Sequence, residues 1–176
     1  DLWVMKSDGT EEQQVTFTDE WQEGGAFFMP DNETILYRAW KKSDQGKTGG
    51  LPMTIFTIKK DRSDFQRITT DEGTNWAPYP APDGRHFVFV KLMPNHNYEL
   101  FLMDLITKEQ QRLTFNDAFD GFPSISPDGH YLSFSSSRAG QGRNLFIYLM
   151  DISSLHLGPP VKDSLTKGSI NRFKNK

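Results

Sequence analysis

A turn tripeptide that recurs along the chain constrains the fold more than any other feature of the sequence. It stands at Pro30-Asp31-Asn32, Pro82-Asp83-Gly84 and Pro127-Asp128-Gly129. The intervals of about 45 to 50 residues are typical of stacked supersecondary units. Proline presets φ at the second position of a tight turn, aspartate suits the third, and the fourth needs a positive φ, which glycine or asparagine adopts. Each tripeptide is therefore expected to close a β-hairpin.

Four short segments recur in one order around each turn. The first segments, before the turns, are 26–29, 78–81 and 123–126, and the second segments, after the turns, are 34–37, 86–89 and 131–134. The third segments are 2–5, 55–58, 100–103 and 147–150. The fourth segments end in the pairs Val15-Thr16, Ile68-Thr69, Leu113-Thr114 and Leu165-Thr166. β-Branched and aromatic residues bounded by turn residues favour strands. Repeats of four antiparallel strands at this period are typical of a β-propeller. The sequence therefore predicts an all-β fold, a β-propeller of four-stranded antiparallel blades.

The order of the segments also sets the phase of the blades. If the segment before each turn is the innermost strand, residues 1–20 are the two outer strands of one blade. Residues 21–70, 71–115 and 116–170 are then whole blades, and 171–176 form a tail. About 3.5 blades are fewer than the 4–8 with which propellers close. We therefore expect the remaining blades to come from the rest of a longer chain or from another chain.

Composition narrows the classes of function. The net charge is −3 and the basic residues are scattered, which indicates no nucleic-acid partner, and no apolar stretch is long enough for a membrane span. The chain has no cysteine, which excludes thiol chemistry. No histidine pair has the spacing of a metal site, and no Gly-x-Ser-x-Gly motif is present. We therefore predict no catalytic group, no cofactor and no metal.

The motifs resemble TolB-like propeller repeats, WD-like repeats built around a Pro-Asp-Gly turn. The resemblance covers nearly the whole chain and is most specific at Asn75-Trp76-Ala77-Pro78, at Arg112-Leu113-Thr114 and at 119–129. The last stretch, continuing to Asn144-Leu145-Phe146-Ile147, is similar to the closing blade of bacterial TolB-like proteins, so the chain resembles their C-terminal portion. Asn32 and the segment after Ser153 depart from the pattern. The resemblance implies a periplasmic protein with a ring of about six blades.

The resemblance leaves several functions open, because one fold serves many roles. The leading hypothesis is a non-catalytic scaffold that binds a protein or peptide partner in the bacterial cell envelope. One alternative is an accessory propeller that gates the substrates of a peptidase. A second alternative is a sugar-active propeller that uses a divalent metal ion. The site has to decide between them.

The channel mouth, where the innermost strands begin, is the expected site. Seven positions before each turn proline stand Glu23, Asn75 and Asp120. They are predicted to form part of a polar ring for a cation, a peptide amine or a sugar. The alternative is that each side chain caps its own loop, as aspartate and asparagine commonly do.

Three larger side chains lie close to this ring. Trp76 and Phe122 are predicted to stack on a sugar or to anchor a peptide, and the alternative is that they pack between blades. Arg138 is predicted to bind a carboxylate through two hydrogen bonds, or to pair with a nearby aspartate. Met5, Met103 and Met150 recur at one place in the blade and are expected to fill the core.

Overall fold

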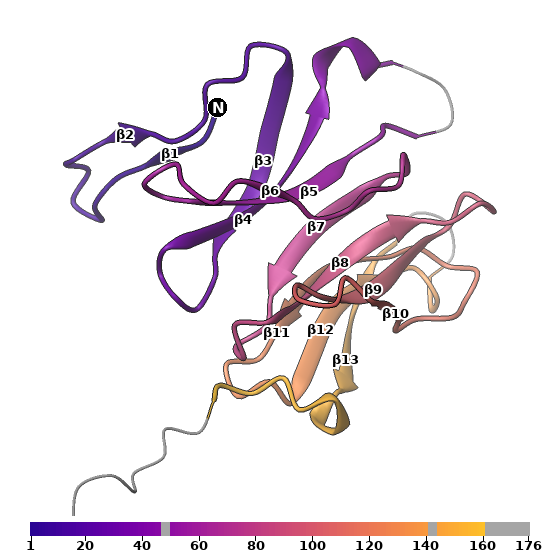
Figure 1. Cartoon of the computed structure of the whole chain (residues 1–176). Coiled ribbons are helices and arrows are strands. Elements are labelled where there is room, and N and C mark those ends of the chain that lie inside the picture. The colour runs from indigo at the N-terminus through magenta and orange to yellow at the C-terminus, as the bar shows by residue number, and fades with distance from the viewer. Residues whose placement is uncertain (47–49, 141–143, 161–176) are drawn as a thin grey trace, which may run out of the picture.

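The computed structural model describes residues 1–46, 50–140 and 144–160, which form four antiparallel sheets (Figure 1). The strands are β1 (Trp3–Val4) and β2 (Gln13–Gln14); β3 (Trp21–Phe28), β4 (Thr34–Lys41), β5 (Thr54–Lys59) and β6 (Gln66–Arg67); β7 (Asn75–Pro80), β8 (His86–Leu92), β9 (Tyr98–Asp104) and β10 (Gln110–Arg112); and β11 (Asp120–Ile125), β12 (Tyr131–Ser136) and β13 (Phe146–Asp151). Two short 3₁₀ helices are η1 (Lys42–Asp44) and η2 (Ser153–Leu155). These sheets fit about 3.5 blades, which confirms the predicted all-β propeller fold. The strand expected to end at Leu165-Thr166 lies outside the described residues.

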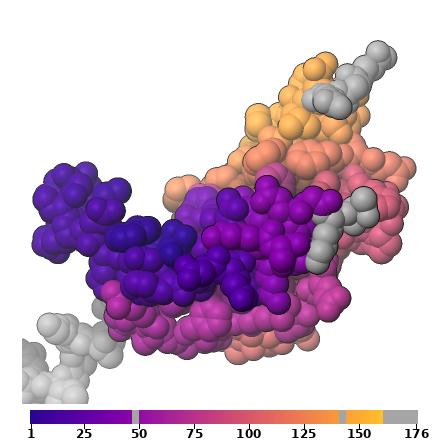
Figure 2. All heavy atoms as spheres, turned by 90° about the horizontal axis from the view of Figure 1, so that it is seen from above, coloured from indigo at the N-terminus to yellow at the C-terminus, as the bar shows by residue number. Residues whose placement is uncertain are grey.

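The sheets follow one another in chain order. Within a sheet each strand pairs antiparallel with the next strand along the chain. Strands β3 and β7 are in contact, and so are β7 and β11, so the strands before the turns lie side by side at the inner edge. Figure 2 shows the β1–β2 hairpin and the sheet β11–β13 at opposite ends of the molecule. No helix within the described ranges has the length and apolar character needed to cross a bilayer.

The turn tripeptides close the inner hairpins as predicted. The fourth turn residue has a positive φ in each case, 60° at Asn32, 73° at Gly84 and 75° at Gly129. The turn aspartate also accepts hydrogen bonds from backbone N–H groups that follow it. Oδ1 of Asp83, for example, accepts from the N–H groups of Arg85 and His86, both at 2.9 Å. The residues of the tripeptide therefore stabilise the turn through contacts within their own hairpin.

Three apolar clusters join neighbouring sheets. Successive side chains of a strand point to opposite faces. On β4, Ile35, Tyr37 and Ala39 pack toward the first sheet, and Leu36 packs toward the third. A third cluster, which includes Val88, Val90, Leu132 and Phe134, joins the sheets β7–β10 and β11–β13. Each blade is thus stabilised by burying apolar side chains against the next one.

The recurring methionines do not share one environment. Met103 is buried in the cluster between the second and third sheets, as expected. Met5 is 67% exposed, so the expectation of a core residue is wrong there. Trp3, two positions earlier, is also exposed, which shows that this face of the hairpin is uncovered within the described part of the chain. The packing neighbour, and not the repeat position, decides burial.

The aliphatic-threonine pairs lie directly after the outermost strands and tie them to the third strands. In each of the three pairs that the structure describes, the threonine hydroxyl oxygen accepts the backbone N–H that begins the third segment of the same unit. The bonds run from Leu2 to Thr16 at 2.7 Å, from Ile55 to Thr69 at 2.9 Å and from Leu100 to Thr114 at 2.9 Å. The feature that these repeats share is therefore a threonine hydroxyl that accepts a hydrogen bond from one backbone N–H group.

Replacing one of these threonines tests that role. Thr69 is fully buried, so Thr69→Val keeps its shape but leaves the N–H of Ile55 without an acceptor. We expect the free energy of unfolding to fall by about 1–3 kcal/mol, the cost of a buried unsatisfied donor. Urea denaturation measures it. Thr69→Ser keeps the hydroxyl and is the control. A Thr69→Val protein as stable as Thr69→Ser would show that the bond contributes nothing.

Candidate functional site at the mouth of the inner strands

The three predicted polar residues stand where the inner strands begin, and each bonds within its own entry loop. Glu23, Asn75 and Asp120 all have buried side chains. Their partners are polar residues four or five positions earlier in the chain: Thr18 donates to Glu23, Asn75 donates to Asp71 at 3.1 Å, and Asn116 donates to Asp120 at 2.6 Å. No hydrogen bond or ion pair joins any two of the three residues. They hold their loops in place, and a shared ligand-binding role remains a prediction.

One oxygen of each of these side chains has no hydrogen-bond partner in the protein. Within the described ranges, the buried side-chain polar atoms without such a partner are Oε2 of Glu23, Oδ1 of Asn75, Oδ1 of Asp120, Nε and Nη1 of Arg38, and Nε1 of Trp40. The nitrogen of Asp1 lies 3.2 Å from Oε2 of Glu23. Native proteins satisfy nearly all buried polar groups, so such atoms call for an explanation.

All of these atoms lie at the same end of the inner strands. Arg38 and Trp40 stand on β4 opposite Gly24 and Gln22 of β3, next to Glu23. Neither residue was predicted from the sequence. The available signal was a charged residue inside the otherwise apolar segment 35–40 of a predicted strand. We call the starts of β3, β7 and β11, together with Arg38 and Trp40, the mouth.

A β-bulge follows the polar residue of each inner strand. The strand register shifts after Gly24, after Trp76 and after Gly121. At the bulge, Gly25, Ala77 and Phe122 have φ values of 58°, 48° and 55°. Positive φ strains a residue with a side chain, and bulges re-aim the side chains beside them. The backbone therefore presents Phe122 in a strained conformation, with 55% of the residue exposed.

The aromatic residues at the mouth form one cluster between two blades. The ring of Trp76 lies 4.9 Å from Phe122 and 6.4 Å from both Tyr98 and Phe119, measured between ring centroids. Trp76 is partly buried and joins β7 to the next sheet. Phe122 rests on Trp76 in an edge-to-face contact, also lies 6.1 Å from Phe119 between ring centroids, and remains exposed. The mouth therefore offers one exposed apolar ring on a packed aromatic base.

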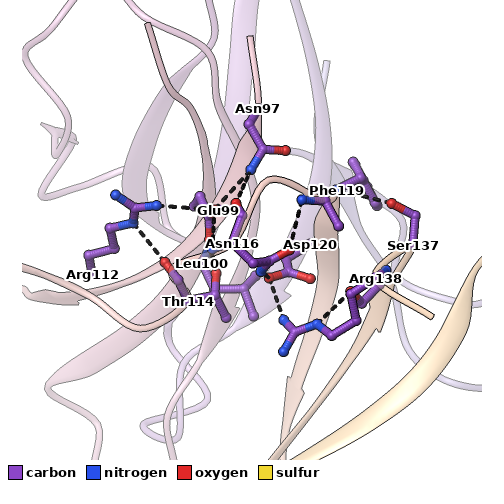
Figure 3. A network of polar contacts seen from close by, with 12 residues as sticks. Asn97, Glu99, Leu100, Arg112, Thr114, Asn116, Phe119, Asp120, Ser137 and Arg138 are labelled. Atoms are coloured by element: carbon purple, nitrogen blue, oxygen red, sulfur yellow. Dashed lines mark hydrogen bonds and ion pairs between the residues drawn. The ribbon is translucent and has the colours of Figure 1, made fainter. Parts of the chain in front are cut away.

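Arg138 pairs with Asp120 in the network shown in Figure 3. Its Nη2 donates to Oδ2 of Asp120 at 2.7 Å, and its Nε donates to the hydroxyl of Ser136 at 2.9 Å. The guanidinium also lies over the rings of Phe134 and Tyr148. The expected pairing with a nearby aspartate is thus present. A role of Arg138 in binding a partner's carboxylate remains a prediction.

A second buried carboxylate, absent from the sequence analysis, extends this network. Glu99 is fully buried on β9. It accepts hydrogen bonds from the side-chain amide of Asn97 at 2.9 Å, the backbone N–H of Asn116 at 3.1 Å and the hydroxyl of Thr114. It also forms an ion pair with Nη2 of Arg112 at 3.1 Å. Asn116 bonds to both Glu99 and Asp120, so the two carboxylates are linked across neighbouring blades (Figure 3).

The chain is similar in sequence and in structure to known proteins. No family model matches the chain. Over 106 residues, 60% of the chain, it is 33% identical to an uncharacterised protein of Agrobacterium fabrum, 34% of which is covered. Over 44% of the chain and 19% of the relative, it is 34% identical to the Tol-Pal system protein TolB of Alcanivorax borkumensis. The crystal structure of TolB from Acinetobacter baumannii matches 85% of the chain and 34% of its own length, with 25% identity and a TM-score of 0.70. The chain has a TolB-like β-propeller fold.

The TolB-like propeller spans about a third or less of these relatives. Its fold is also shared with proteins of other activities. An oligogalacturonate lyase in complex with manganese matches 85% of the chain and 40% of its own length, at 19% identity with a TM-score of 0.55. A puromycin hydrolase matches 82% of the chain and 24% of its own length, at 16% identity with a TM-score of 0.61. Identities this low establish the fold alone.

The far end of the propeller, beside the turns, carries a charged cluster. Nδ1 of His86 lies 2.5 Å from Oδ2 of Asp83, and Nε of Arg85 donates to both carboxylate oxygens of Asp104 at 3.0 Å. The hydrogen bonds from Arg85, and those from the backbone N–H groups of Ile106 and Thr107, hold the pKa of Asp104 well below its usual range. In the described segments no group of three or more His, Cys, Asp or Glu side chains is arranged to hold a metal ion.

The low pKa of Asp104 predicts an acid-dependent loss of stability. A carboxylate whose pKa is lowered by folding stabilises the protein above its unfolded-state pKa of about 4, and this contribution is lost as the pH falls toward the folded-state pKa. We expect the free energy of unfolding to fall more steeply below about pH 4 in the unaltered protein than in Arg85→Met. Denaturant unfolding at a series of pH values measures both slopes. Parallel profiles would contradict the assignment.

Proposed function

We propose that the TolB-like propeller is a non-catalytic scaffold of the bacterial cell envelope that docks a protein or peptide at its mouth. The observation that carries the proposal is the gathering of unpartnered buried polar atoms at that end. Apart from Oε2 of Glu23, which lies 3.2 Å from the nitrogen of Asp1, each such atom lacks a partner that a docked chain would supply. We also propose a periplasmic location, which the likeness to TolB, a protein of the Tol-Pal system, supports.

The mouth also has the composition of a docking surface. Aromatic residues and arginine dominate the binding energy of protein interfaces, usually around a central apolar anchor. Phe122 is such an anchor, since it is exposed and rests on Trp76. We propose that the docking residues are Glu23, Asn75, Trp76, Asp120, Phe122 and Arg138, and that they lie on blades at 21–70, 71–115 and 116–170.

Site-specific photocrosslinking tests the proposal. A photoreactive phenylalanine analogue at position 122 should crosslink one partner in envelope extract. The same analogue at position 115 is the control, because Phe115 is 72% exposed but follows the outermost strand of its blade. Both residues are exposed aromatics, so unspecific capture would label them equally. Equal labelling, or none at position 122, would show that the mouth does not dock a protein.

Two alternatives have their own outcomes. An accessory role in a peptidase is favoured if the full gene encodes a hydrolase domain beside the propeller. A sugar-active role is favoured if the protein converts an oligogalacturonate to an unsaturated product in the presence of manganese. Either result would replace scaffold docking as the conclusion. Neither has an observation at the mouth that favours it over docking.

A further inference from the structure

Arg38 occupies a space that two glycines leave open. It stands on β4 directly opposite Gly24 of β3. A Cβ at Gly24 would lie 2.8 Å from its Nη1, and a Cβ at Gly25 would lie 3.7 Å from its guanidinium carbon. Leu36, two positions earlier on the same face, packs toward the sheet β7–β10. The guanidinium therefore lies at the mouth, beside the inner strand, on the face that meets the next blade.

This guanidinium has donors but no acceptor. Its Nε and Nη1 are buried without a hydrogen-bond partner, and burial lowers the pKa of Arg38. The indole Nε1 of Trp40 is buried and unpartnered too, and the guanidinium carbon lies 5.3 Å from the centroid of that ring. Three donors are thus gathered in one place. Desolvating a charged group in this way is costly unless an acceptor is supplied.

Three other arginines of the propeller form ion pairs with carboxylates. Arg85 pairs with Asp104, Arg112 pairs with Glu99, and Arg138 pairs with Asp120. Within the described ranges no carboxylate forms an ion pair with Arg38. The exposed Arg62 and Arg67 donate instead to the backbone oxygens of Gln14 and Thr69. Arg38 has neither kind of acceptor among the described residues.

The charge and shape of the site select the ligand. A guanidinium is a planar fork that matches the two oxygens of a carboxylate. One cation and a neutral indole N–H balance a single negative charge, whereas a phosphate group brings about two. We propose that Arg38 and Trp40 form a binding site for one carboxylate at the mouth. The assignment rests on the proposed function in one respect, that the carboxylate belongs to a docked peptide, as its C-terminus or as an acidic side chain.

Nuclear magnetic resonance of the indole N–H of Trp40 tests this site directly. The probes are N-acetylglycine for a C-terminal carboxylate, N-acetyl-aspartate amide for an acidic side chain, and N-acetylglycinamide as the uncharged control. We expect a saturable shift of the Trp40 signal with at least one of the two acids, at millimolar affinity of the order typical for a single ion pair. The control should leave the signal unchanged. The acid that binds more tightly identifies the source of the carboxylate.

Variants separate the site from unspecific effects of anions. Arg38→Met keeps the Trp40 reporter. It should lower the affinity for the acid about tenfold or more, because a charge-assisted hydrogen bond is lost. Trp40→Phe identifies the reporter signal by removing it. Arg38→Met should melt at the same temperature as the unaltered protein or higher, since it removes an unpaired buried charge. An arginine with a purely structural role would instead lower the melting temperature.

Several results would overturn the inference. They are the absence of a saturable shift with either acid, an unchanged affinity in Arg38→Met, tighter binding of inorganic phosphate, and binding of galacturonate without binding of the peptide acids. The proposed function fails separately, in the crosslinking at position 122, because Phe122 belongs to a different blade from Arg38. A Trp40 shift without crosslinking would keep the carboxylate site and reject protein docking.

Discussion

Gly129→Ala is expected to lower the free energy of unfolding by about 3 kcal/mol, whereas Gly84→Ala should cost only about 1 kcal/mol. The two glycines hold the same turn position and nearly the same φ, 75° and 73°. A Cβ at Gly129 would lie 2.4 Å from the backbone nitrogen of Gly158, and one at Gly84 would meet nothing within 4 Å. The first substitution therefore adds a clash with rigid backbone to the strain that both share.

Denaturant unfolding of the two variants measures this difference. Gly84→Asn is a further control, because Asn32 already holds the equivalent position with a φ of 60°. We expect Gly84→Asn to be less destabilising than Gly84→Ala, since asparagine tolerates positive φ better than alanine does. Equal losses for Gly84→Ala and Gly129→Ala would show that the segment around Gly158 does not pack against the last turn.

Arg138→Met is expected to destabilise the propeller by about 3 kcal/mol, the lower end of the range for breaking a buried ion pair. Asp120 is fully buried, and Arg138 supplies the opposite charge at 2.7 Å. Without it, the carboxylate keeps only the amide of Asn116 as a side-chain donor, and its Oδ1 already has no partner. The loss therefore comes from an uncompensated charge and not from lost contact area alone.

A double variant distinguishes charge from packing. Adding Asp120→Asn to Arg138→Met removes the unpaired charge, so part of the lost stability should return, about 1 kcal/mol or more. Arg62→Met is the matched surface control, because the exposed Arg62 lies over the ring of Phe17 and forms no ion pair among the described residues. An Arg138→Met protein as stable as Arg62→Met would contradict a structural role for the Asp120 pair.

The propeller fold was predictable because its signals are local. A Pro-Asp-Gly turn needs only the φ of one residue and the hydrogen bonds of one aspartate, and both are set within a few residues. The positions of Glu23, Asn75 and Asp120 at the strand starts followed from the same repeat. Met5 marks the limit of this reasoning, because equivalent repeat positions predict equal burial only where equivalent neighbours pack on them.

The pairing of the polar groups at the mouth was not predictable in the same way. Nothing in the segment 35–40 indicates that Arg38 lacks a carboxylate, since a partner could stand anywhere in the chain. Glu99 likewise reads as an isolated charge in the sequence, although Asn97 and residues of the stretch 112–116 contact it. Burial and pairing depend on which strands become neighbours, which single positions in a sequence do not encode.

The sequence by itself determined the turns, the order of the strands and the blade type, because backbone preferences and side-chain alternation act over short distances. Only the tertiary structure decided which polar groups at the strand starts are satisfied. Asp120 gained Arg138 from across its hairpin, whereas Arg38 lies over two glycines and gained no carboxylate. That difference arises from long-range packing, and it is the reason why we propose the mouth as the binding site.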